Sequence, residues 1–131
     1  MTWLDGVDRA QALRALFPDG DPSLDAIHMH ELTFHRDGPS LALRFDLPAY
    51  PSEPPEKWLQ AGHNTVQVTL ALDGVRSVTL EGWGRDISGK LELRPGAALG
   101  FDCNFVTEGC KLTATCDFVR IAHVSGYHKA E

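Results

Sequence analysis

The chain has 131 residues, of which 43% are hydrophobic, so it is long enough for one soluble domain with a buried core. Its formal net charge is -6, from 12 Lys and Arg against 18 Asp and Glu. This acidic balance argues against binding to nucleic-acid phosphates and is compatible with a basic protein partner. We therefore expect one β-rich domain over residues 1–131, with no nucleic-acid partner.

The N-terminal sequence carries two Asp and lacks the apolar core of a signal peptide. No apolar run is long enough to span a bilayer, and three Cys do not suit a secreted disulfide framework. We therefore expect a cytoplasmic protein with no membrane partner.

Residues 5–17 predict the only helix of the chain. Val7, Ala10 and Leu13 recur at helical spacing and form an apolar stripe, and Pro18 ends the pattern. We expect this helix to cover one face of a sheet.

The remaining chain predicts strands separated by turn residues. Hairpin turns are expected at Asp37-Gly38, Asp73-Gly74 and Glu108-Gly109, and the four prolines of residues 48–58 predict an extended loop. The fold class that follows is mainly β (α+β), with an antiparallel, mostly meandering sheet of about seven strands that is curled or sandwich-like. The expected strands are 26–35, 41–47, 64–72, 75–83, 90–94, 98–106 and 110–124.

Two of these hairpins do not match a simple two-residue turn. In the Asp37-Gly38 hairpin, regular pairing would point His30 into the core and Met29 into solvent. We therefore predict a β-bulge near His30-Glu31 that points Met29 inward and His30 outward. In the Asp73-Gly74 hairpin, a loop one residue longer would pair Leu70 with Val78, and we prefer that side-chain match.

The third hairpin places all three cysteines in one short stretch. A two-residue turn at Glu108-Gly109 pairs Cys103 with Ala114 and Phe101 with Cys116. The shared face is almost wholly apolar, so Cys103 and Cys116 are expected to be buried thiols rather than metal ligands. This predicted face consists of Leu99, Phe101, Cys103, Phe105, Leu112, Ala114, Cys116 and Phe118.

The opposite face of this hairpin is polar and carries Asp102, Asn104 and Asp117. It is either an ordinary solvated sheet face or a surface that binds a partner. Trp58 and Trp83 are either core lids or exposed anchors of an interface, where Trp is enriched. We take Asp102, Asn104, Asp117, Trp58 and Trp83 as candidate partner-binding residues.

Chemistry-bearing motifs are few. His28 and His30 have a spacing found among metal ligands and lie beside Glu31, but no third ligand is evident. The sequence has no Gly-x-Ser-x-Gly and no His-Glu-x-x-His, so it predicts neither catalysis nor a cofactor. A metal-binding domain or metalloenzyme that uses His28, His30 and Glu31 remains the alternative function.

The order of segments resembles the immunity protein 50 family of bacterial polymorphic toxin systems. The resemblance lies in an N-terminal Trp-helix segment, "LFPDGDPSLDAIHMHELTF", "PSEPPEKW" and "NTVQVTLALDGVRSVTLEGW", over at least residues 3–94. It implies a small, β-rich, cytoplasmic protein that binds and silences a cognate toxin domain without catalysis. A plain oligomerising scaffold is a third possibility, and a homo-oligomer is compatible with all three.

Overall fold

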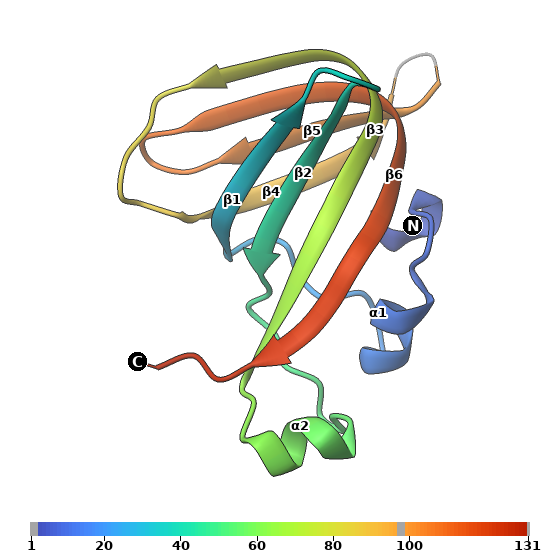
Figure 1. Cartoon of the computed structure of the whole chain (residues 1–131), viewed down its shortest axis with the longest axis vertical. Helices are drawn as coiled ribbons and strands as arrows, with labels where there is room; N and C mark the ends of the chain where they lie inside the picture. Colours follow the sequence, from blue (N-terminus) through green and yellow to red (C-terminus); the bar gives the residue numbers. More distant parts are fainter. Residues whose placement is uncertain (1–2, 97–98, 131) are drawn as a thin grey trace.

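The computed structural model of this chain describes residues 3–96 and 99–130, and it shows one antiparallel sheet. Its six strands close into a barrel in the order β1-β2-β3-β6-β5-β4 (Figure 1). The prediction of a mainly β, antiparallel, curled sheet is confirmed, but there are six strands rather than seven. In chain order the elements are η1 (Trp3–Gly6), α1 (Gln11–Leu16), β1 (Ile27–His35), β2 (Ser40–Asp46), α2 (Glu56–Ala61), β3 (Thr65–Glu81), β4 (Ser88–Pro95), β5 (Phe101–Val106) and β6 (Lys111–Tyr127).

The missing seventh strand reflects a hairpin that does not form. β3 runs without a turn through Asp73-Gly74, so neither pairing predicted for that hairpin occurs. Gly74 has φ +66°, and a register shift between Val75 and Ser77 accompanies the bend of the strand. Because β3 and β6 are both 17 residues long and pair along their length, a turn at Gly74 would break that ladder.

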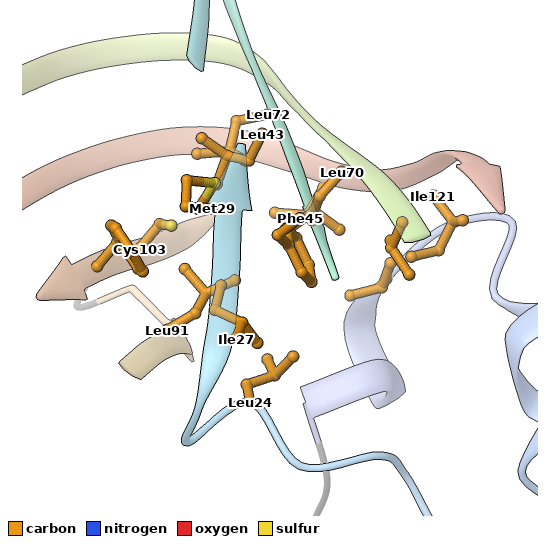
Figure 2. Packing of buried hydrophobic residues seen from close by; sticks show 14 of the residues in the cluster. Leu24, Ile27, Met29, Leu43, Phe45, Leu70, Leu72, Leu91, Cys103 and Ile121 are labelled. Carbon is orange, nitrogen blue, oxygen red and sulfur yellow. The ribbon is translucent and has the colours of Figure 1, made fainter. Parts of the chain in front are cut away.

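The bulge predicted in the first hairpin is present. Met29 pairs with Phe45 and Glu31 pairs with Arg44, so the register shifts at His30. Ile27 and Met29 are buried as a result (Figure 2). The apolar pattern therefore decided the register here, since regular pairing would have exposed two large apolar side chains.

The predicted helix over residues 5–17 is wrong in its extent. A 3-10 turn covers Trp3–Gly6, and α1 begins only at Gln11. Between them the backbone of Asp8 joins β6: its N–H donates to Val119 O at 2.8 Å, and its carbonyl accepts from Ile121 N at 2.9 Å. These two bonds hold Asp8 as an added strand position, which interrupts the helix. The apolar stripe is nevertheless buried, at Val7, Ala10 and Leu13.

Part of the proline-rich loop is helical, which the sequence analysis missed. α2 follows Pro54-Pro55 directly and ends at Ala61, just before Gly62, which has φ +72°. Proline at the start and glycine just past the end are recognised helix boundaries, so this signal was present in the sequence.

The C-terminal hairpin has the predicted register. Phe101 pairs with Cys116, Cys103 with Ala114, and Phe105 with Leu112. The prediction is wrong at its outer end, because Leu99 is 85% exposed and Phe118 pairs with Asp73 of β3 and is also exposed. The alternation of buried and exposed residues in β6 is interrupted there, because the next buried residue after Cys116 is Val119. The predicted strand start at Ala98 lies outside the described residues.

The core fills the barrel interior. Phe45, Leu70, Leu72 and Leu91 extend from β2, β3 and β4 towards the same space (Figure 2). Each fully buried side chain of this kind stabilises the fold by about 1.5–3 kcal/mol.

Within the residues that the structure describes, no helix has both the length and the apolar character required to cross a membrane.

Candidate partner-binding surface

The polar face of the C-terminal hairpin lies on the outside of the barrel. Asp102 and Asn104 alternate with the buried Cys103 along β5, and both are half-buried by their neighbours. Asn104 accepts a hydrogen bond from the hydroxyl of Thr113 at 3.1 Å. Pairing of Asp102 with Thr115 brings it diagonally next to Asp117 of β6. Asp102, Asn104 and Asp117 therefore share one outer face.

Of these three residues, Asp117 has a charged partner on the neighbouring strand. Its carboxylate lies 3.3 Å from Nε of Arg76 in β3, and both side chains are about half exposed. The guanidinium of Arg76 also donates to the carbonyl oxygens of Leu99 and Cys116. The negative charge at this point is thus partly neutralised within the molecule.

The two candidate tryptophans lie in different parts of the molecule. Trp58 belongs to α2, and its ring centroid lies 6.1 Å from that of Tyr50 and 6.0 Å from that of His63. Trp83 lies in the connection between β3 and β4 and is 76% exposed. α2 and that connection are far apart in Figure 1. The structure therefore does not bring the two indoles into one site.

A buried carboxylate, which sequence reasoning missed, organises the end of β2. Asp46 is 2% exposed and is the centre of a hydrogen-bonded cluster. His30 Nε2 and Lys129 Nζ lie 2.7 and 2.8 Å from its Oδ2, and the hydroxyl of Tyr127 donates to the same oxygen. Gln67 donates to Oδ1 at 3.2 Å. No spacing in the sequence signals this cluster, because its members come from four separate segments.

Protonation within this cluster follows from the hydrogen bonds. Burial alone raises the pKa of Asp46, but hydrogen bonds from Lys129, Tyr127, His30 and Gln67 outweigh it and lower the pKa to about 2. Burial, together with the hydrogen bond to Asp46, raises the pKa of Tyr127 to about 12. Near neutral pH, Asp46 is therefore an ionised acceptor and Tyr127 a neutral donor.

The three residues of the metal alternative point to different partners. His28 Nδ1 lies 2.7 Å from Lys129 Nζ, while His30 contacts Asp46. Glu31 accepts a hydrogen bond from Nε of Arg44 at 3.1 Å. Among residues 3–96 and 99–130, no group of three His, Cys, Asp or Glu side chains is arranged to hold a metal ion. The geometry therefore gives this alternative no support.

The cysteines lie where the register placed them. Cys103 and Cys116 are buried free thiols, and burial raises their pKa to about 12 and about 11. A thiol that stays protonated is a poor nucleophile and a poor metal ligand. Cys110, beside the turn, is half-buried.

The second half of β3 has an unpaired edge. Pairing with β2 ends at Asp73, and the last backbone bond on that side runs from Val75 N to Pro39 O at 3.0 Å. Among the residues that the structure describes, 76–81 pair only with β6. We call residues 76–81 the free β3 edge. Sequence reasoning missed it because the expected Asp73-Gly74 hairpin would have given this segment another partner.

Apolar side chains surround the free β3 edge and the adjoining connection. Val78 and Leu80 pair with Ala114 and Leu112, so they continue the inner face of the barrel, yet they are 40% and 37% exposed. We call the following set of partly exposed residues the apolar mouth: Phe34, Val78, Leu80, Trp83 and Ile87. A hollow of about 100 Å³ beside it is lined by Trp83 and Ile87, by residues 29–32 and by Phe105.

Comparison with known proteins identifies a family but no individual relative. Residues 9–127 match the model of the family described as Immunity protein 50. No curated protein matches the chain significantly, and neither does any solved structure.

Proposed function

This chain belongs to the Immunity protein 50 family, and on that basis we propose that it binds and neutralises a cognate toxin domain. It acts in the cytoplasm, as part of a polymorphic toxin system, and performs no catalysis. The observation that carries this proposal is the family match over residues 9–127, which covers nearly the whole chain. It extends the resemblance of residues 3–94 to the C-terminal hairpin.

The proposed mechanism is occlusion of the toxin's active site. A net charge of -6 favours a basic partner, such as a toxin domain that acts on nucleic acid. Complementary charge accelerates the encounter of two proteins and disfavours wrong partners. Neutralisation then depends only on the affinity and position of the bound protein, and it requires no reactive group.

We propose that the outer face with Asp102, Asn104 and Asp117 supplies part of this electrostatic attraction, and that Trp83 supplies an apolar contact. Support for the first comes from their shared position on the outer side of β5 and β6. Support for the second comes from the large exposed area of the Trp83 indole. Trp58 stays a predicted contact residue, although its indole already packs against Tyr50 and His63.

The experiment uses the toxin domain encoded by the neighbouring reading frame, in a catalytically inactive form. Co-purification followed by titration calorimetry should show a stable one-to-one complex. Asp102→Lys should weaken the affinity about tenfold, because it reverses a charge on the proposed surface. Glu53→Lys makes the same charge change in the exposed loop before α2 and should leave the affinity unchanged.

Two results would count against the proposal at different levels. If the wild-type chain fails to bind the toxin domain and fails to protect cells that express the active toxin, the immunity role is wrong. If wild-type binds but Asp102→Lys binds equally well, the outer face of β5 and β6 lies outside the interface.

A further inference from the structure

The free β3 edge is one of the strand edges that closure of the barrel leaves unpaired, since β1 also pairs with β4 at Ile27 and His28 alone. In an antiparallel strand, alternate backbone N–H and C=O groups point to each side, so about half of those in residues 76–81 point away from β6. Such an edge is a template for another strand unless charges, proline or a covering segment protect it. The charged residues of the free β3 edge, Arg76 and Glu81, lie at the two ends of the segment, and residues 77–80 contain neither a charge nor a proline. Among the described residues no segment pairs along this side.

The side chains of the free β3 edge differ between the inner and the outer face of the strand. Val78 and Leu80 point to the inner, apolar side, where they remain partly exposed. Ser77 points to the outer side, where its hydroxyl lies 3.0 Å from that of Thr115. Thr79 and Glu81 follow on the same side by alternation. A strand added here would therefore meet apolar side chains on one face and polar side chains on the other.

The charges nearby favour a basic occupant. Glu81, Asp86 and Glu108 are exposed, and within the part of the chain that the structure describes none of them has an ion-pair partner. At the Glu81 end of the edge the cations are Arg85 and Lys111, and Lys111 pairs with Glu81 in the strand register of β3 and β6, so the carboxylates are in excess there. Arg36 and Arg76 lie at the other end, where Arg76 is bound to Asp117. Glu81 continues the strand, which places its carboxylate where a cross-strand Lys or Arg of an added strand could pair with it.

Resting on the proposed function, we propose that an extended segment of the cognate toxin adds as a strand to the free β3 edge. Its inward side chains are apolar and cover Val78 and Leu80. Its outward side chains include a Lys or Arg opposite Glu81. One large side chain of the same segment enters the hollow beside Trp83 and Ile87. Strand addition of this kind takes affinity from backbone hydrogen bonds and specificity from pockets for alternate side chains.

The test compares a lysine on the free β3 edge with a lysine placed outside it. Leu80→Lys puts a charge on the inner face, where the added strand would bury it, and should weaken binding of the inactive toxin domain at least tenfold. Ala15→Lys adds the same charge at an exposed position of α1, outside the proposed site. It should change the dissociation constant by no more than about threefold. Circular dichroism of both variants checks that the barrel is folded.

Hydrogen exchange gives a second measurement that needs no substitution. Amides of residues 76–81 that point away from β6 should exchange more slowly in the wild-type complex than in the free chain. Protection in the complex that avoids this segment would overturn the proposal, even if Leu80→Lys weakened binding by disturbing the fold.

The remaining outcomes separate this proposal from its premise. If wild-type binds the toxin domain and Leu80→Lys binds as tightly as Ala15→Lys, strand addition is wrong while the immunity role stands. If wild-type does not bind, both are wrong. Sedimentation of the free chain tests a second copy as the occupant: a dimer that Leu80→Lys dissociates, with toxin affinity unchanged, would also overturn the proposal.

Discussion

The two ends of β3 differ in how much of their bonding capacity is used. Near its start, Gln67 joins Tyr127 and Lys129 around the buried Asp46, so that both carboxylate oxygens accept hydrogen bonds. Near its end, the free β3 edge leaves backbone groups unpaired within the described part of the chain, and the large apolar side chains of the apolar mouth are partly exposed. The first end contributes stability, and the second leaves binding capacity available. Recognition is therefore expected where the fold leaves its own groups unpaired.

The largest expected effect is at the buried carboxylate. Asp46→Ala removes the shared acceptor of Lys129, Tyr127 and His30, and should lower the free energy of unfolding by about 3 kcal/mol. Urea denaturation of the variant measures this. The control Asp102→Ala removes a carboxylate from the outer face and should cost no more than about 0.5 kcal/mol. If Asp46→Ala lowers the free energy of unfolding by less than about 1 kcal/mol, the proposed difference in stability between the two ends of β3 is wrong.

A smaller effect is expected from acid. The pKa of Asp46 is about 2 in the folded chain against an ordinary value of 3.8, so the unfolded state takes up the proton first as the pH falls. The stabilisation is fully present above about pH 5 and is lost as the pH falls through 3.8 and then about 2, a change of about 2 kcal/mol. Free energies of unfolding measured from pH 6 to pH 2 should fall more steeply for wild-type than for Asp46→Asn. Parallel curves would show that the cluster does not hold the carboxylate ionised.

The smallest expected effect on stability is at the apolar mouth. Trp83→Ala should change the free energy of unfolding by no more than about 0.5 kcal/mol, because the indole is 76% exposed. Trp58→Ala is the matched control and should cost about 2 kcal/mol, since that ring packs on Tyr50 and His63. Thermal unfolding of both variants gives the comparison. Equal losses would mean that Trp83 has a structural role that its exposure does not suggest.

Local apolar patterns were sufficient to predict much of the sheet. The bulge at His30 and the register of Cys103 against Ala114 both followed from keeping large apolar residues on one face. The prediction of a turn at Asp73-Gly74 was wrong because the structure there is decided by long-range pairing. The dipeptide favours a turn locally, but the competing ladder between β3 and β6 depends on residues about 45 positions away in the chain. No window around Gly74 contains that information.

The candidate sites were harder to predict than the fold. Asp46 gathers partners from β1, β3 and the C-terminal residues, and Lys129 lies 83 positions from it in the sequence. The length of the helix predicted over residues 5–17 was too great, because two backbone hydrogen bonds between Asp8 and β6 compete with helix formation. The free β3 edge is defined by where β2 ends, so it becomes visible only once strand order and register are known.

The half-buried Cys110 gives a practical consequence. The buried thiols of Cys103 and Cys116 stay protonated up to about pH 11. A maleimide or iodoacetamide reagent should therefore modify Cys110 alone. Cys110 also lines the hollow beside Trp83. A fluorophore attached there would sit next to the indole and report directly, by quenching or by a change of emission, when another molecule occupies that end of the barrel.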